Sequence, residues 1–121
     1  MRAYQVIAYD KIPALVETNR PTPGNGEILL EIAACGLNFG DLLMAKGQYQ
    51  EKPAFPFSPG LEIAGTVSAL GRNVSGLQEG QRVMALTDFG GYAQTALARA
   101  GDVYGIPDKL GWAEAAGFPI T

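Results

Sequence analysis

The sequence contains no histidine and a single cysteine, Cys35, so several common kinds of site are excluded. Imidazole is the commonest metal ligand and the commonest general base, and a structural zinc cage uses several thiolates. One cysteine also excludes a disulfide within the chain. Any chemistry on this chain must therefore use groups other than these.

Charge is scarce as well. Charged residues make up 17% of the chain, and the formal net charge is −3 at pH 7. Proteins that bind phosphate backbones need a broad basic surface, which this composition does not supply. We therefore do not expect nucleic acid as a partner.

Long hydrophobic runs are missing too. A membrane-spanning helix needs about 20 mainly apolar residues, and no stretch of the sequence approaches that length. The first residues also lack the apolar run of a signal peptide. We expect no membrane span and a cytoplasmic location.

The composition that is present suits one domain with one core. The chain has 121 residues, of which 47% are hydrophobic, and its 16 glycines and 8 prolines are spread along the sequence. That spacing is typical of turns between short strands and not of a disordered tract. We predict a single domain over residues 1–121.

Short apolar runs between turn residues predict a mainly β fold. The expected strands are 2–8, 14–18, 27–35, 62–70, 81–86, 92–97 and 103–106, and the expected short helices are 40–46 and 112–116. The first two strands should form an antiparallel pair. In residues 27–35, alternate positions from Ile28 to Ala34 should share one face. This pattern favours a closed or partly open β-barrel with one or two short helices.

The stretch from Cys35 to Gly65 is the candidate site. Asn38 lies at the turn between an expected strand and an expected helix, and Glu62 lies just inside the next long strand. Strand ends present side chains from a rigid scaffold into neighbouring clefts. Residues 48–58, rich in proline and aromatics, should form a loop across the surface, and such a loop often covers a cleft.

Several motifs in this order resemble a known family. They are Gly24-Asn25-Gly26-Glu27-Ile28-Leu29-Leu30, Cys35-Gly36-Leu37-Asn38-Phe39-Gly40-Asp41, Pro59-Gly60-Leu61-Glu62-Ile63-Ala64-Gly65, Gly80-Gln81-Arg82-Val83, Gly90-Gly91-Tyr92-Ala93 and Glu114-Ala115-Ala116. The chain resembles the N-terminal GroES-like domain of the medium-chain dehydrogenase/reductase superfamily. Within it, the resemblance is closest to the zinc-independent quinone oxidoreductase branch, which includes the vesicle amine transport protein 1-like members.

The resemblance implies a site without zinc. In the zinc-dependent branch, a cysteine and a histidine that ligate the metal occupy the positions of Asn38 and Leu61. An amide and an isobutyl group cannot replace a thiolate and an imidazole around Zn²⁺. The family's frequent Gly-Asp-Arg-Val also becomes Gly80-Gln81-Arg82-Val83, so an ion pair made by that aspartate is not expected.

The resemblance also implies an activity for the full-length protein, namely hydride transfer from NADPH to a quinone or an activated enone. The nicotinamide would lie between this barrel and a Rossmann domain expected after residue 121. Asn38 would approach the nicotinamide and substrate, Tyr49 would line the substrate pocket, and Thr121 would lie near the cofactor. Relatives are often homodimers. Because no Gly-x-Gly-x-x-Gly stands between a strand and a helix, the chain alone is expected to be inactive.

Two other functions use the same barrel. One is an enoyl reductase module of a larger synthase. The other is a non-catalytic GroES-like interaction domain, although the loop at 48–58 is too rich in proline and aromatics to resemble the long mobile loop of a co-chaperonin.

Each candidate residue near the turn also has a structural interpretation. Asn38 and Asp41 are the residue types that cap a helix N-terminus, and capping is compatible with cofactor contact for Asn38. Asp41 is best interpreted as a cap. Tyr49 is either a loop aromatic that covers the barrel mouth or a substrate contact.

The remaining polar residues of the stretch are interpreted structurally. Glu62 lies in an apolar strand and should pair with a cation, for which Arg82 is the nearest candidate. Cys35 should be an inert core residue, because no cation near it in sequence would lower its pKa. Tyr92 should serve packing and not chemistry.

Overall fold

Residues 1–120 of the chain are described by a computed structural model in which strands form most of the regular structure. The strands are β1 (Arg2–Gln5), β2 (Ala14–Glu17), β3 (Glu27–Cys35), β4 (Glu62–Leu70), β5 (Arg82–Leu86), β6 (Thr95–Arg99) and β7 (Val103–Gly105). The helices are α1 (Phe39–Ala45) and α2 (Trp112–Ala116), with a 3-10 turn at Ala100–Asp102.

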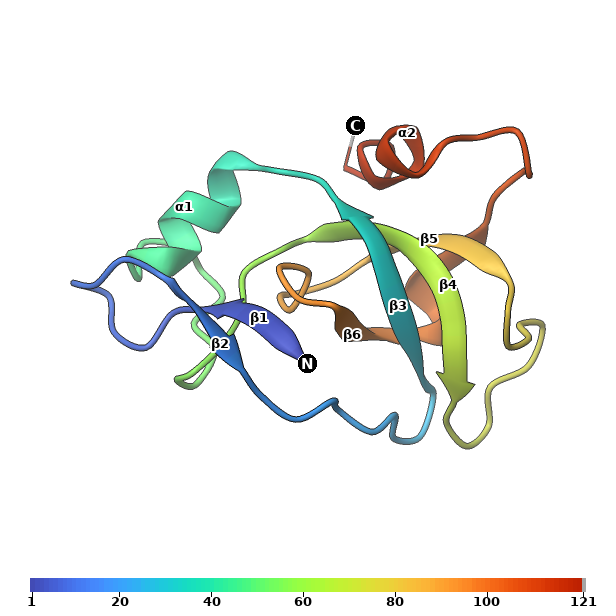
Figure 1. Cartoon of the computed structure of the whole chain (residues 1–121), viewed down its shortest axis with the longest axis horizontal. Coiled ribbons are helices and arrows are strands. Elements are labelled where there is room, and N and C mark those ends of the chain that lie inside the picture. The colour runs from blue at the N-terminus through green and yellow to red at the C-terminus, as the bar shows by residue number, and fades with distance from the viewer. Residues whose placement is uncertain (121) are drawn as a thin grey trace.

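The strands form two open sheets (Figure 1). β1 and β2 make an antiparallel pair in which Arg2 lies opposite Glu17. The larger sheet has the antiparallel order β6-β3-β4-β5-β7. α2 packs on the larger sheet, and α1 lies above the β1–β2 pair in Figure 1. The predicted class, a mainly β and partly open fold with short helices, is confirmed.

The boundaries of β3, β4 and α2 agree with the prediction, whereas β1 and β6 differ from it. β1 ends at Gln5 because Val6 pairs with Phe57 through hydrogen bonds of 2.7 and 3.2 Å. β6 begins at Thr95 and not at Tyr92, because residues 92–94 bond to β1. The N–H of Tyr4 donates to the Tyr92 carbonyl at 2.8 Å, for example. These contacts join the two sheets.

The single face predicted for β3 is interrupted. The pairing of β3 with β4 changes register between Leu29 and Leu30 and again between Ile32 and Ala34. A register change of this kind turns the following side chains toward another neighbour. Ala34 consequently packs against α2 with Ala64, whereas Ile28 and Leu30 pack in the main core.

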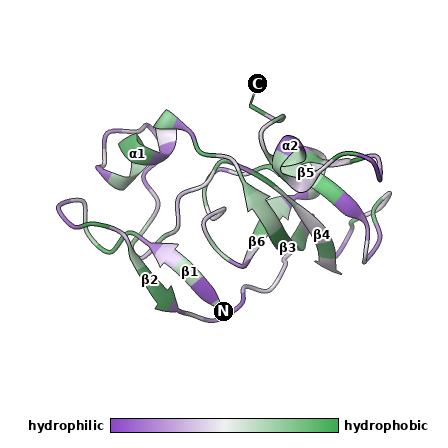
Figure 2. Cartoon of the chain, turned by 45° about the horizontal axis from the view of Figure 1, so that its top comes forward, coloured by the Kyte–Doolittle hydropathy of each residue, from purple (hydrophilic) through white to green (hydrophobic). Residues whose placement is uncertain are grey.

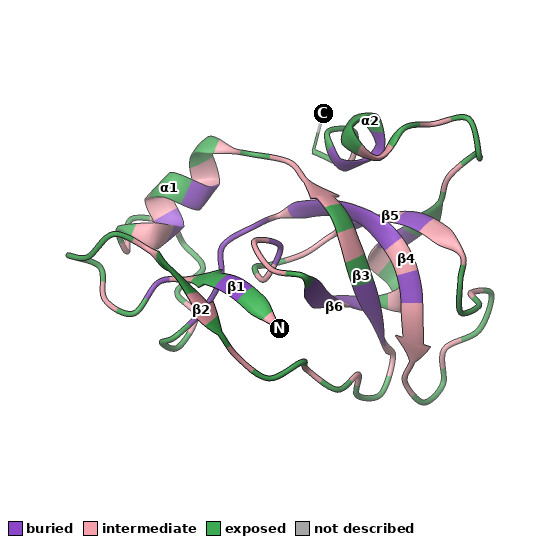
Figure 3. Cartoon of the chain, in the orientation of Figure 1, coloured by how far each residue is buried: buried purple, intermediate pink, exposed green. Residues whose placement is uncertain are grey.

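The main core lies on the five-stranded sheet. Its buried members are Ile28, Leu30, Ile63, Val67, Val83, Ala85, Ala96, Ala98 and Val103. β4 is buried along much of its length, while the β1–β2 pair is largely exposed (Figure 3). β3 is mainly hydrophobic, and the turns at the edges of the molecule are mainly polar (Figure 2). The sheet therefore provides a rigid base, and the site is built at the ends of its central strands.

Arg82 does not pair with Glu62, so that prediction is wrong. In the β4–β5 register Glu62 lies opposite Leu86, while Arg82 lies opposite Thr66 at the other end of the pairing. Arg82 instead donates to the carbonyl oxygens of Pro107 (3.0 Å) and Leu110 (2.8 Å). Its guanidinium also lies 4.2 Å from the centre of the Trp112 ring, an arrangement that stabilises the start of α2.

Candidate active-site cleft

The Asn38 turn lies where β3 ends, next to the residue at which the antiparallel strand β4 begins. After β3, the N–H of Gly36 donates to the carbonyl of Glu62 at 2.9 Å. Asn38 then takes an extended conformation (φ −131°, ψ 152°) as the N-cap of α1. Because the two strands are central in the sheet, Asn38 and the Pro59–Leu61 segment start from fixed positions.

Asp41 connects three segments around this turn. It is 2% exposed. Its carboxylate accepts hydrogen bonds from Asn38 N–H (2.9 Å), Gly60 N–H (3.1 Å) and the Tyr92 hydroxyl (2.7 Å). The predicted capping role is confirmed by the bond to Asn38, which is one half of a capping box. The other two bonds extend that role across the fold.

Asn38 leaves part of its side chain without a partner. Its amide faces the N–H of Asp41 but makes no hydrogen bond of regular geometry there. Its Nδ2 is buried, and among residues 1–120 nothing accepts a hydrogen bond from it. A buried donor without an acceptor costs about 1–3 kcal/mol. Nδ2 is therefore a buried side-chain donor of this turn that remains unsatisfied among residues 1–120.

A cleft of about 330 Å³ lies next to this turn. Its lining residues are Tyr49, Gln50, Glu51, Leu61, Leu86, Thr87, Asp88, Arg99, Asp102 and Ile120. Tyr49 and Leu61 are thus brought together, while Asn38 is not itself a lining residue. The absence of a side chain at Gly40 lets Tyr49 and Leu61 pack close to the backbone of α1. A Cβ on Gly40 would stand 3.0 Å from the Tyr49 ring and 3.2 Å from Leu61. Thr121, the other predicted site residue, lies outside the described residues.

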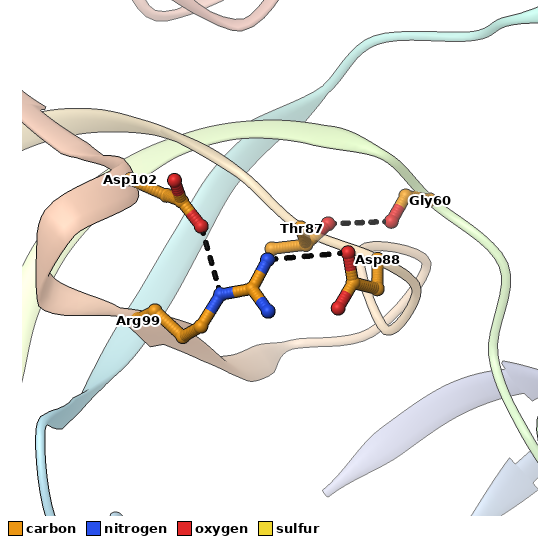
Figure 4. A network of polar contacts seen from close by, with 5 residues as sticks. All are labelled: Gly60, Thr87, Asp88, Arg99 and Asp102. Atoms are coloured by element: carbon orange, nitrogen blue, oxygen red, sulfur yellow. Dashed lines mark hydrogen bonds and ion pairs between the residues drawn. The ribbon is translucent and has the colours of Figure 1, made fainter.

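Sequence reasoning missed the wall formed by Thr87, Asp88 and Arg99 (Figure 4). The Thr87 hydroxyl donates to the Gly60 carbonyl at 2.6 Å. Arg99 donates to Asp102 at 2.9 Å and to Asp88 at 3.3 Å. These carboxylates raise the pKa of Arg99, with the Asp102 hydrogen bond as the main cause. The one available signal was that Thr87 and Asp88 follow directly after a strand.

Glu62 holds the C-terminal segment against the site. The residue is 4% exposed, and its Oε2 accepts a hydrogen bond from Ile120 N–H at 2.9 Å. Its side chain also fills the space beside Gly36, where a Cβ would collide with it. Glu62 therefore has a structural role, as predicted. Its partner is the backbone N–H of Ile120, which borders the cleft, and not the cation that was expected.

Cys35 is partly buried and packs against the main core, as predicted. Burial, with smaller contributions from the charges of Asp41 and Glu62, raises the pKa of Cys35 to about 12. Burial and the hydrogen bond to Asp41 likewise raise the pKa of Tyr92 above its usual value. Both groups therefore remain protonated near neutral pH.

The raised pKa of Cys35 leads to a prediction about alkylation. At pH 8 iodoacetamide should modify Cys35 at least about a hundredfold more slowly in the native protein than in urea, because only the thiolate reacts. Peptide mass spectrometry measures both rates. Since the folded state keeps a proton that the unfolded state loses, stability should fall as the pH rises from about 9 toward 12. Equal labelling rates would contradict the burial of this thiol.

Within residues 1–120, no three His, Cys, Asp or Glu side chains gather closely enough to hold a metal ion. In the same residues, neither helix has the length and apolar character needed to cross a bilayer.

The open sheets, the capped turn at Asn38 and the adjoining cleft define a GroES-like β domain. Residues 24–108 match the alcohol dehydrogenase GroES-like domain family. The chain belongs to this family, and it is similar to quinone oxidoreductases of the medium-chain dehydrogenase/reductase superfamily.

Three proteins illustrate the similarity. The chain is 41% identical over 101 residues to the human synaptic vesicle membrane protein VAT-1 homolog-like, covering 84% of this chain and 24% of that protein. The crystal structure of that human protein superimposes with a TM-score of 0.92 at 37% identity, covering 99% of this chain and 40% of that chain. Identity to the bovine quinone oxidoreductase-like protein 2 is 38% over 112 residues, which are 92% of this chain and 32% of that protein.

The third is the quinone oxidoreductase of Thermus thermophilus, described together with its NADPH complex. It superimposes with a TM-score of 0.84 at 34% identity, covering 99% of this chain and 37% of that chain. The chain thus spans about a quarter to a third of the length of the curated relatives it matches.

Proposed function

We propose that this chain is the substrate-side domain of an NADPH-dependent, zinc-independent oxidoreductase that reduces quinones or activated enones. The observation that carries the proposal is the buried, unpartnered Nδ2 of Asn38 beside a cleft in a domain of this family. In the full-length protein a Rossmann domain follows residue 121, and the chain alone is inactive.

The residues present fit a nicotinamide. The carboxamide of that ring carries an oxygen acceptor, which the Asn38 amide is suited to meet. Asn38 and Thr121 are the residues of this chain that would hold the cofactor. NADPH, when bound, supplies a hydride that carries two electrons to the acceptor. The NADPH complex described for the Thermus thermophilus relative supports the choice of NADPH as the cofactor.

The chain's own part in the reaction is to place and polarise the acceptor. Tyr49 lines the cleft, and a tyrosine hydroxyl can donate to a carbonyl oxygen as negative charge develops on it. Leu61 and Leu86 form the apolar walls that keep water away from the reacting carbon. One hydride and one proton from solvent convert a quinone to the hydroquinone, or an enone to the saturated ketone.

Charge in the cleft favours an uncharged substrate. Three carboxylates, those of Glu51, Asp88 and Asp102, line it against the single guanidinium of Arg99. A phosphate-bearing thioester, such as an enoyl reductase would bind, meets net repulsion here. This observation favours a quinone or simple enone over the enoyl reductase alternative.

The absence of zinc is proposed from residue chemistry. Asn38 and Leu61 stand where zinc-dependent relatives have a cysteine and a histidine. Leu61 packs, as an apolar residue would, against the buried cluster of Val6, Met44 and Phe57. A thiolate and an imidazole are the ligands that Zn²⁺ selects, and neither is present at these two positions.

The test uses the full-length protein. We expect NADPH to be oxidised in the presence of simple benzoquinones and enones, with activity unchanged after dialysis against a chelator. Absorbance at the NADPH band gives the rate, and elemental analysis gives the metal content. One tightly held zinc ion at Asn38, or no turnover with any quinone or enone, would overturn the proposal.

A further inference from the structure

A second, larger cleft adjoins the candidate active-site cleft. Its volume is about 410 Å³. The two clefts share four lining residues, which are Leu86, Thr87, Asp88 and Arg99. A molecule seated beside Tyr49 can therefore continue past this shared wall without leaving the surface of the domain.

The second cleft has apolar side chains along part of its lining, next to polar residues such as Gln5, Glu27 and Thr95. Its apolar lining residues include Ala54 and Phe57 from the loop, Phe89, and Leu97 of β6. Phe57 and Phe89 meet edge to face, with ring centres 6.4 Å apart. Phe89 is 41% exposed, so part of this aromatic surface is open to solvent. Such a lining suits a hydrocarbon chain.

The wall that the two clefts share is polar, but its charged side chains form ion pairs within the protein. Arg99 is the one cationic side chain among the described residues that line either cleft. It is held between Asp88 and Asp102, as Figure 4 shows. An anionic group would compete with these two carboxylates, whereas a hydrocarbon chain can lie along the aliphatic part of the arginine.

We propose that the second cleft is a subsite for the apolar chain of the substrate, so that the preferred acceptor is a quinone with an alkyl or isoprenyl tail. The inference rests on the proposed function, since the quinone ring is placed beside Tyr49. The loop at residues 48–58 lines both clefts, through Tyr49 in the first and through Ala54, Phe57 and Ser58 in the second. Ring and tail are thus recognised by one segment.

The experiment compares two benzoquinones with the full-length protein, one bearing a methyl group and one a ten-carbon alkyl chain. Calorimetry without NADPH gives the dissociation constants, and NADPH oxidation gives kcat/KM. Because each buried methylene strengthens binding several-fold, we expect the long chain to bind at least about tenfold more tightly, even in a half-open cleft.

Two variants locate the effect. Phe89→Ala removes the aromatic end of the subsite, and Ala54→Glu places a charge on its rim. Each should reduce the advantage of the long chain to less than about threefold. Tyr104→Ala is the matched control, because Tyr104 is an aromatic of similar exposure (48%) that lines neither cleft. It should leave the advantage unchanged.

The outcomes separate the two proposals. If the methyl quinone is reduced but the long chain binds no more tightly, the subsite does not exist, and another segment or a second copy of the chain covers this cleft. If Tyr104→Ala lowers the advantage as much as Phe89→Ala, the tail binds elsewhere and the inference fails. If neither quinone is reduced while the long chain still binds more tightly, the proposed function fails and the subsite stands.

Discussion

Replacing Asp41 by alanine should destabilise the domain by about 3–5 kcal/mol, more than the ~1 kcal/mol typical of a lost helix cap. The carboxylate is 2% exposed and accepts three hydrogen bonds, from Asn38 N–H, Gly60 N–H and the Tyr92 hydroxyl. Removing it leaves two backbone donors and one hydroxyl without an acceptor in a buried place. Hydrogen bonds to charged groups are also stronger than neutral ones.

Thermal unfolding of the full-length protein measures this effect. The midpoint of the transition assigned to this domain should fall by roughly 10 °C or more. Tyr92→Phe is the matched control, because it removes one of the three hydrogen bonds and no volume of consequence. It should cost about 1 kcal/mol. If Asp41→Ala costs no more than Tyr92→Phe, the carboxylate does not connect the three segments as its geometry indicates.

The sequence predicted the local elements of this fold well because their signals are local. β3 and α2 have apolar spacings bounded by turn residues, and both end where that pattern ends. β1 was misjudged at its C-terminal end, and β6 was misjudged at both ends. Their boundaries depend on pairing with Phe57 and with residues 92–94, which lie about fifty to ninety positions from β1 along the chain.

The structure brings part of the candidate site together, for a similar reason. Tyr49 and Leu61 both line the cleft, and they belong to the same continuous stretch as Asn38. Asn38 and Leu61 lie in motifs that carry the family resemblance, and that resemblance also implied a role for Tyr49. Arg99 carries no local signal of function, and its place at the cleft follows from the pairing of β6 with β3. The predicted Glu62–Arg82 ion pair was wrong because the sequence does not show the register between β4 and β5. That register places the two residues at opposite ends of the pairing.

Glu62 and Asp41 together stabilise the conformation of the Asn38 turn through hydrogen bonds. The Asp41 carboxylate accepts a hydrogen bond from the N–H of Asn38. The backbone carbonyl of Glu62 accepts one from Gly36, and the Glu62 carboxylate accepts one from the N–H of Ile120. Both carboxylates face backbone N–H groups. Their buried positions are therefore accounted for by hydrogen bonding, whereas the Nδ2 of Asn38 has no acceptor among residues 1–120.

Replacing Asn38 by alanine should lower kcat/KM of the full-length enzyme by about tenfold to a hundredfold while changing stability by less than ~1 kcal/mol. The two effects separate because Nδ2 makes no hydrogen bond within residues 1–120. Its removal relieves a buried, unsatisfied donor, which offsets the loss of the N-cap side chain. NADPH oxidation with a simple benzoquinone and thermal unfolding give the two numbers.

Asn38→Ser distinguishes catalysis from capping. Serine caps a helix about as well as asparagine but lacks the amide donor. If Nδ2 contacts the nicotinamide or the substrate, the serine variant should be as inactive as the alanine variant and as stable as the native protein. If serine restores the activity that alanine loses, Asn38 acts through the geometry of α1 alone. The buried amide would then need another explanation, and the assignment of this turn to the active centre would fall with it.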